Sequence, residues 1–457
     1  MFEGRNGGTM QRYVIPAILM LTLVGPAARA QDDTAWVRYY SAEQPVMGRA
    51  VAVAGTAVYT AGMAQNDNQD FFVFKYSGGG DSLWLRHYDL GSDEMAVAVR
   101  ADGAGNLLVA VLSEGDPQEL IIAKLDPAGD TLWTRRQPGF MPTALAVGAD
   151  NAVYAWSHSG HPAPFDTLAL LKYSADGTQL WARRYRFGMQ NRAAGCGWVD
   201  GGIIALAGVE DGGMKQMVLR FDAEGETTWT RTFEGIGMAE VSSVAPAPER
   251  GFYVSATEGG MLKLLRCDPD GGLLWMRDFA TQLPPETYSN LATDEFDNVY
   301  FASQTPSMAM GFACVNPEGE ELFQAQTEVR AEVRSIAVDE MNQPVVVGTA
   351  MEGGQSAVTV KFAWAPGISS PAPDRRPAGP FGATLLGNGM LSFSLLEAGR
   401  WEAMLYGADG RIAARLHAGH LPAGEHRFRV GRLAAGSYTL VVSRGDTRLS
   451  AKVVLPE

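Results

Sequence analysis

The chain has 457 residues, of which 46% are hydrophobic, and its formal net charge is −14, a size sufficient for one large domain and a small one. Residues 31–363 hold 23 basic and 43 acidic side chains, whereas residues 381–457 hold 9 basic and 6 acidic ones. Residues 31–363 are thus strongly acidic and would repel the phosphate backbone of nucleic acid, so we do not expect nucleic acid as a partner.

Residues 1–30 have the features of a secretory signal. Arg12 precedes an apolar run at residues 14–24, and Ala28-Arg29-Ala30 gives the small-x-small pattern of a cleavage site. The run is too short to span a membrane as a helix, and no other apolar run approaches that length. We therefore expect Sec-type export, no transmembrane segment in the mature chain, and a secreted or outer cell-surface location.

One hairpin pattern recurs after this signal. An alternating strand ends at Lys172, a turn follows at Asp176-Gly177, and a second strand carries Trp181 and ends at Tyr185. The aromatic residue recurs at steps of 48, 49, 48, 48, 46 and 48 residues, at Trp36, Trp84, Trp133, Trp181, Trp229, Trp275 and Phe323. A fixed period in this range indicates a solenoid or a propeller.

The ends of the repeat region decide between these two architectures. Two further apolar runs precede each hairpin, so each repeat holds four strands, a to d, with the Trp on strand d. The first strand d, residues 36–40, has no a, b or c before it, and the last a to c set, residues 333–362, has no d after it. Pairing these ends would leave no open edge. We predict an all-β fold in which residues 31–363 form a seven-bladed β-propeller closed by its N-terminal outer strand.

The recurring Trp and the Arg two residues after it need a physical reason. We expect the indole to fill the space between blades near their outer side, with a stacked cofactor as the alternative. We expect the Arg on the opposite face of the strand, either solvated or paired with an acid on the next blade.

The repeat resembles the β-propeller repeats of secreted bacterial proteins. These read Lys-Leu-Asp-x-x-Gly-x-x-x-Trp together with an apolar-Asp-x-x-Gly-Asn-apolar segment. The matching residues are Lys124-Leu125-Asp126-Pro127-Ala128-Gly129 with Trp133, Asp102-Gly103-Ala104-Gly105-Asn106, and Asp294 to Tyr300. The resemblance covers roughly 330 residues and implies the fold, but those repeats share no catalytic residues and so imply no activity.

Three cysteines, Cys196, Cys267 and Cys314, lie in different repeats. An odd number at this spacing does not indicate a disulfide framework, so we expect small buried side chains. Because Cys267 and Cys314 fall near equivalent positions of neighbouring repeats, one bridge between them is the alternative.

Methionines recur in the loops that enter strand a. If strand a lines the central channel, they should ring one mouth, as apolar filling or, alternatively, as a ring for a soft metal or a ligand. The loops between strands b and c should share this face, and they are acidic and variable in length, as binding loops are. The predicted binding residues are Met47, Met95, Met141, Met189, Met238, Asp67, Asp70, His158, His161 and Asp166.

Chemical motifs are scarce in the sequence. A zinc ion at His158 and His161 would need more ligands than Asp166. Asp67, Asn68 and Asp70 could contribute to a calcium loop, but the Gly and the distal Glu of a known loop type are absent, so we predict no metal. The sequence contains no Gly-x-Ser-x-Gly elbow, His-Glu-x-x-His pair or phosphate loop. We accordingly predict no catalytic residues and no cofactor.

The repeat stops after Phe362. Residues 364–380 carry five prolines, which indicates an extended linker. Beyond it, residues 381–457 return to short alternating strands separated by turns, which predicts a small immunoglobulin-like β-sandwich.

This tail resembles the C-terminal sorting domain of the Bacteroidetes-type type IX secretion system. The motif residues that match are Gly410, Arg411, Gly424, Gly436, Tyr438 and Lys452. The Pro-Asn-Pro that usually opens that domain is missing, with Leu386 to Gly389 in its place. The resemblance implies the secretion machinery as a partner and export through the outer membrane. The alternative is an ordinary accessory sandwich that stays attached.

These features together predict a non-enzymatic secreted or surface-displayed propeller that binds a protein or glycan through the loop face. A propeller hydrolase or lyase, whose residues come from several blades, is the alternative function. A third class is a structural surface component without a specific ligand.

Overall fold

The computed structural model describes residues 34–65, 68–160, 165–233, 242–247, 251–258, 261–281, 290–351, 354–363, 383–386, 390–395, 399–407, 411–421, 424–429, 433, 436–444 and 447–455. The regular elements among them are all β-strands. Within these ranges no helix is long and apolar enough to cross a membrane.

Five antiparallel four-stranded sheets follow one another in chain order. They are β2 (Val46–Ala54), β3 (Ala57–Gln65), β4 (Gln69–Tyr76) and β5 (Ser82–Tyr88); β6 (Glu94–Ala101), β7 (Leu107–Ser113), β8 (Glu119–Leu125) and β9 (Thr131–Pro138); β10 (Phe140–Val147), β11 (Val153–Ser159), β12 (Leu168–Tyr173) and β13 (Gln179–Tyr185); β14 (Asn191–Val199), β15 (Gly202–Glu210), β16 (Met214–Phe221) and β17 (Thr227–Thr232); and β18 (Ser242–Ala247), β19 (Gly251–Glu258), β20 (Met261–Cys267) and β21 (Leu273–Phe279).

A seven-stranded sheet follows, in which one long strand serves two neighbours. Its order is β1-β27-β26-β25-β24-β23-β22, and its strands are β22 (Leu291–Thr293), β23 (Val299–Gln304), β24 (Ala309–Val315), β25 (Glu321–Val338), β26 (Pro344–Ala350), β27 (Ser356–Phe362) and β1 (Thr34–Tyr40). The first part of β25 pairs with β24, and the part from Ala331 onward pairs with β26. The chain thus passes from an outer strand d to an inner strand a without a break in the strand.

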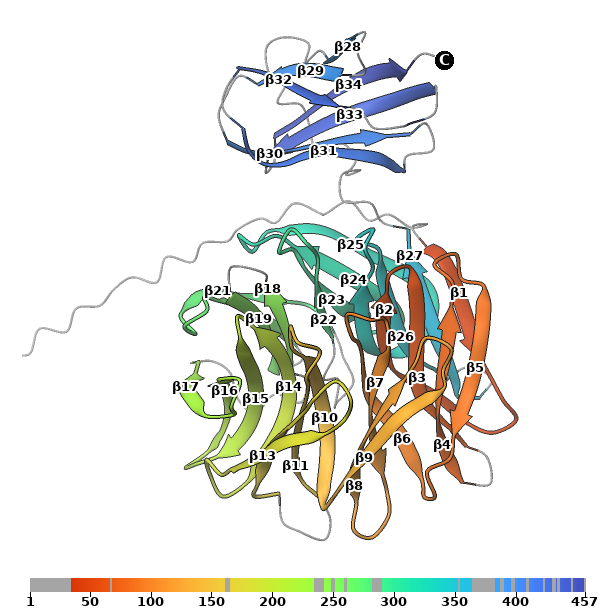
Figure 1. Cartoon of the computed structure of the whole chain (residues 1–457), viewed down its shortest axis with the longest axis vertical. Coiled ribbons are helices and arrows are strands. Elements are labelled where there is room, and N and C mark those ends of the chain that lie inside the picture. The colour runs from red at the N-terminus through yellow and green to blue at the C-terminus, as the bar shows by residue number, and fades with distance from the viewer. Residues whose placement is uncertain are drawn as a thin grey trace, which may run out of the picture.

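The N-terminal strand completes the last sheet. β1 pairs antiparallel with β27, and Tyr39 lies opposite Val358, as the unequal strand count predicts. Contacts also continue from each first strand to the next, through β2, β6, β10, β14, β18, β22 and β25, and β25 contacts β2. Figure 1 shows the sheets side by side, with the red β1 next to β27.

Indoles join each sheet to the one that follows it. Trp133 Nε1 donates to Ala175 O at 3.2 Å, in the turn between β12 and β13. The indole also lies on Gly177 of that turn, where a Cβ would come within 2.7 Å of Trp133 and where φ is +84°. Only glycine tolerates both conditions. Trp36 on β1 makes the same contact with the turn between β4 and β5, since its Nε1 donates to Gly78 O at 3.1 Å.

The arginine that follows each Trp by two residues lies on the same strand face, so the expectation of the opposite face is wrong. Residues i and i+2 of a strand share a face. The guanidinium carbon lies 5.3 to 6.0 Å from the centre of the Trp ring in six strands. The alternative role as a partner for an acid on the next sheet is confirmed at two places, where Arg86 lies 2.7 Å from Asp130 and Arg183 lies 3.5 Å from Glu226.

Two of the turns between strands a and b close on a buried ion pair. Asp102 lies 2.8 Å from Lys124 Nζ, and Asp339 lies 2.6 Å from Lys361 Nζ. Each aspartate also accepts the backbone N–H groups two and four residues ahead. Desolvation would raise the pKa of Asp102, but hydrogen bonds from Lys124, Asn106 and the turn backbone outweigh it and hold that pKa below its usual value. In both turns, a lysine of the neighbouring strand therefore neutralises the charge of the buried aspartate.

The three cysteines are buried and free. The alternative bridge between Cys267 and Cys314 is thus not formed. Burial raises the pKa of Cys196 and Cys267 to about 12, so both behave as small apolar side chains.

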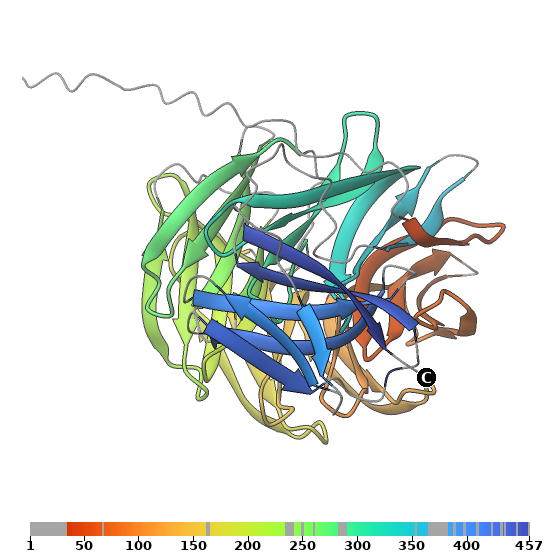
Figure 2. The same ribbon diagram turned by 90° about the horizontal axis from the view of Figure 1, so that it is seen from above.

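The C-terminal module, residues 383–455, forms two sheets, β28-β29-β32 and β31-β30-β33-β34. The strands are β28 (Ala383–Leu386), β29 (Met390–Leu395), β30 (Gly399–Tyr406), β31 (Ile412–Leu421), β32 (Gly424–Arg429), β33 (Gly436–Arg444) and β34 (Thr447–Leu455). One buried cluster around Phe393, Trp401 and Leu440 draws on both sheets. The module, in blue, lies over one face of the other sheets in both views (Figures 1 and 2).

Candidate functional site

The connections that precede strand a and those between strands b and c meet on one face, which we call the loop face. Its described residues include 41–45, 68, 89–93, 114–118, 139, 160, 165–167, 186–190, 211–213, 233, 280–281, 290, 305–308, 351 and 354–355. Backbone hydrogen bonds tie neighbouring connections together, from Gly139 N to Gln118 O at 2.7 Å and from Asn191 N to Phe165 O at 2.7 Å. The backbone thereby fixes where these variable loops stand.

Three of the predicted methionines occupy one register position. Met47, Met95 and Met141 are each the second residue of their strand, in β2, β6 and β10, and each is half-buried. These three strands contact one another in turn. Arg49 donates to Met95 Sδ at 2.7 Å, although a thioether is a weak acceptor. The structure thus aligns these three methionines on neighbouring strands.

The other two methionines do not extend this row. Met189 lies in the connection before β14 and is 73% exposed, while the second residue of β14 is Arg192. The spacing of 48 residues holds for the repeat but runs through a loop whose length differs from sheet to sheet. Met238, Asp67 and His161 lie outside the described residues.

His158 stands on β11, opposite Met141 on β10. Its side chain is buried against Phe165, and Nδ1 has no hydrogen-bond partner. Burial, followed by the nearby charge of Arg192, lowers the pKa of His158 to about 4. A base with that pKa is neutral and weak at neutral pH, so His158 does not suit the hydrolase or lyase alternative.

Asp166 is engaged elsewhere in the same loop. Its carboxylate pairs with Arg186 and accepts the Thr167 hydroxyl, and its backbone N–H donates to Ser159. His158 and Asp166 therefore do not form a pair with each other among these contacts.

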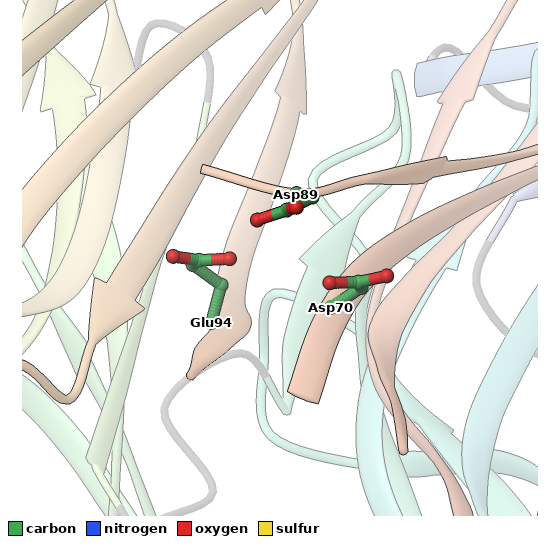
Figure 3. A group of neighbouring side chains, drawn as sticks. All are labelled: Asp70, Asp89 and Glu94. Atoms are coloured by element: carbon green, nitrogen blue, oxygen red, sulfur yellow. The ribbon is translucent and has the colours of Figure 1, made fainter. Parts of the chain in front are cut away.

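Asp70 belongs to a carboxylate cluster that the sequence pattern missed. One carboxylate oxygen each from Asp70 on β4, Asp89 after β5 and Glu94 at the start of β6 lies within 4.8 Å of the others. Figure 3 shows the three groups facing one another. Oxygen ligands of this kind suit a hard cation such as Ca²⁺. The cluster could not be found from spacing, because its members come from three segments of two sheets.

The hydrogen bonds of Glu94 give it a structural role in this cluster. Its two carboxylate oxygens accept from Ser92 N at 2.7 Å and Leu90 N at 3.0 Å. Asn191, which holds the same place at the start of β14, accepts in the same way from Phe187 N at 2.9 Å. Burial raises the pKa of Glu94 although these amides oppose the shift. Glu94 thus holds the loop before β6 through backbone hydrogen bonds, as the uncharged side chain of Asn191 does before β14.

The residues of the sorting motif fall at strand ends and within strands of the C-terminal module. Arg411 closes the turn before β31, where Gly407 N donates to its carbonyl at 2.8 Å. Gly424 and Gly436 are the first residues of β32 and β33, and Tyr438 lies within β33. Lys452 lies opposite Thr439 in the pairing of β33 with β34. Gly410 is outside the described residues.

Comparison with known proteins identifies the fold and nothing narrower. No protein-family model matches the chain, and no curated protein matches its sequence. A chain from the crystal structure of the mitotic checkpoint complex aligns with a TM-score of 0.51 at 12% identity, covering 78% of this chain and 99% of that chain. The Dos1 propeller gives 0.46 at 10%, covering 73% and 97%. The Neurospora crassa Pan2 WD40 domain gives 0.48 at 10%, covering 72% and 94%.

The repeated four-stranded sheets define an all-β protein of the β-propeller class. Identity this low carries no information on ligand or activity.

Proposed function

We propose that this protein is a secreted or cell-surface β-propeller of seven blades that binds a protein or glycan through its loop face. We also propose that its C-terminal module is a type IX-like sorting domain. The observation that carries the binding role is a difference between the two ends of the sheets: the turns at one end are engaged in contacts between blades, and the connections at the other form the loop face.

Ring closure is the first element of the proposal. The seven-stranded sheet counts as two blades that share β25, and β1 supplies the outer strand of the last one. The row of contacts between inner strands, from β2 round to β25 and back to β2, supports a closed ring. A closed ring has no free edge strand at a seam.

The loop face is the second element. On the opposite face, carbonyl groups of the turns accept hydrogen bonds from Trp and Lys side chains of the preceding blade. The loop face instead varies in length, and its connections carry exposed acids in Asp89, Asp93, Glu114, Asp116 and Asp211. Such a surface favours a partner that presents positive groups.

Binding is tested with the full mature chain on a protein and glycan array. The triple variant D93N/E114Q/D116N should weaken capture of the best ligand at least tenfold. The control E224Q/D270N/E340Q removes three exposed acids from the opposite turns and should not. Equal loss in both variants would remove the loop face as the binding site.

The sorting role has its own test. Cells that express the chain without residues 381–457 should retain it inside the outer membrane, whereas the full chain reaches the surface or medium. Normal export of the shortened chain would contradict the sorting proposal and leave the binding proposal standing.

A further inference from the structure

We propose that the turn between β22 and β23 is a guanidinium-binding surface, and that Arg415 of the C-terminal module occupies it in solution and fixes the position of the module on the propeller. The inference does not depend on what the loop face binds.

Arg415, on β31, bridges the two parts of the molecule. One terminal nitrogen lies 2.8 Å from Glu295 of the turn, and the other lies 2.7 Å from Glu402 of the module itself. The guanidinium carbon is 4.2 Å from the centre of the Phe296 ring. An arginine held by two carboxylates and an aromatic face is far more specific than a surface lysine pair.

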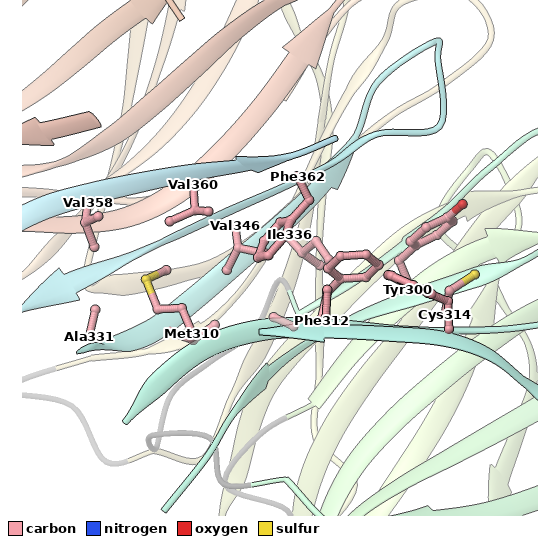
Figure 4. Packing of buried hydrophobic residues seen from close by; sticks show 14 of the residues in the cluster. Tyr300, Met310, Phe312, Cys314, Ala331, Ile336, Val346, Val358, Val360 and Phe362 are labelled. Carbon is pink, nitrogen blue, oxygen red and sulfur yellow. The ribbon is translucent and has the colours of Figure 1, made fainter. Parts of the chain in front are cut away.

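The turn between β22 and β23 differs from the turn between β6 and β7 because no lysine stands beside its aspartate at the equivalent strand position. In the turn between β6 and β7, Lys124 neutralises the buried Asp102. In the turn between β22 and β23, Asp294 takes the place of Asp102, but the strand position of Lys124 is held by Cys314. Figure 4 shows Cys314 beside Tyr300, whose hydroxyl donates to Asp294 at 3.0 Å.

The result is an acidic turn with Cys314 at the strand position where the turn between β6 and β7 has Lys124. Asp294 is buried, Glu295 is exposed toward the module, and Asp297 follows in the same turn. Burial raises the pKa of Asp294 even though hydrogen bonds from Asn298, the Phe296 amide and Tyr300 oppose it. A cation from another part of the chain is what this turn is suited to accept.

The module is complementary to this surface. Its residues 381–457 carry a net charge of +3, against −20 for residues 31–363. Glu402 is held in place beside Arg415; burial raises the pKa of Glu402, while the charge of Arg415 opposes that shift. Among the described residues, Arg415 is thus the cation that contacts both Glu295 and Glu402.

A charge-swap series with a matched control tests the proposal. The mature full chain and the variants R415E, E295R and R415E/E295R are compared by small-angle X-ray scattering and by hydrogen exchange of residues 290–300. The control is E340R, which makes the same charge change at the same position of the equivalent turn between β25 and β26.

The two single variants should raise the radius of gyration and speed exchange in residues 290–300 by roughly tenfold, as the loss of one charge-assisted pair would. The double variant should restore both values, because the new Arg faces Glu402 and the new Glu. E340R should match the wild type. An unchanged radius in R415E, failure of the double variant to recover, or an equal effect of E340R would overturn the proposal.

Discussion

The turn between β6 and β7 and the turn between β22 and β23 share one backbone design but differ in the strand residue that stands near the aspartate. In both, an aspartate accepts the amides two and four residues ahead. Lys124 then closes the first turn, whereas Cys314 stands in its place at the second. Burial raises the pKa of Asp294 despite its hydrogen bonds, whereas hydrogen bonds from Lys124, Asn106 and the turn backbone outweigh burial and lower the pKa of Asp102. A repeat can thus keep its shape while a few substitutions, among them Glu295 and Phe296, change what the turn contacts.

The largest effect on stability should come from removing Lys124 from the buried ion pair with Asp102 in the turn between β6 and β7. K124M removes the partner of a carboxylate that is almost fully buried, and we expect a loss of about 3–5 kcal/mol in the free energy of unfolding. Urea denaturation measures this. K75M is the matched control, because Lys75 donates to a backbone carbonyl, Pro127 O, at 2.8 Å. Equal losses would show that the ion pair adds nothing.

The buried, neutral His158 should make the stability of the protein sensitive to acid. The pKa of His158 is about 4, below the usual 6.5. The unfolded chain therefore binds the proton first, and stability falls as pH drops from 6.5 toward 4, by about 3 kcal/mol in total. H158L should lose this slope. If the variant keeps the same pH dependence, the assignment to His158 is wrong.

The two aspartates should respond to pH with opposite sign. Asp102, with its lowered pKa, contributes stability above the unfolded value of 3.8 that is lost as pH falls through the folded value. Asp294, with its raised pKa, costs stability as pH rises through its folded value. The penalty of D102N should therefore grow with pH, while that of D294N, about 1 kcal/mol near pH 4, should shrink. Denaturation curves between pH 3.5 and 7 would show parallel trends if this account is incorrect.

The smallest effect concerns the indoles. Trp275 Nε1 donates to Pro317 O at 2.8 Å, and W275F should cost about 1 kcal/mol. Phe323 holds the next position in the repeat, but β27 is followed in its sheet by β1 and not by a hairpin, so no such turn faces it. F323W should consequently bring no gain in thermal stability. A gain equal to the loss in W275F would contradict this explanation.

The strand pattern could be predicted because it depends on local signals that repeat. The Trp period and the unequal count of strands led to the pairing of Tyr39 with Val358. The ion pairs were missed, although a signal was present: Asp102 with Lys124 and Asp339 with Lys361 are both 22 residues apart. Asp150 and Lys172 share that spacing, but Lys172 Nζ donates to Ala223 O at 3.1 Å, so spacing alone does not determine the contact.

The candidate site was less predictable because it lies in the connections between repeats. Met189 kept the period of the repeat yet fell outside β14, since the preceding loop is longer than the one before β10. The contact of Arg415 with Glu295 joins two domains, and no periodic pattern within either one reveals it. The repeat therefore predicts the fold, whereas the candidate sites lie where the sequence departs from the repeat and could not be predicted from it.

The most direct test of the closed architecture is a cross-link between its two ends. Y39C/V358C places cysteines at opposite residues of β1 and β27, and mass spectrometry after mild oxidation should find that disulfide in the folded monomer. The shifted pair Y39C/T359C should link far less, because its side chains point to different faces. Absence of the first cross-link, or equal yields from both pairs, would contradict a propeller closed by its N-terminal strand.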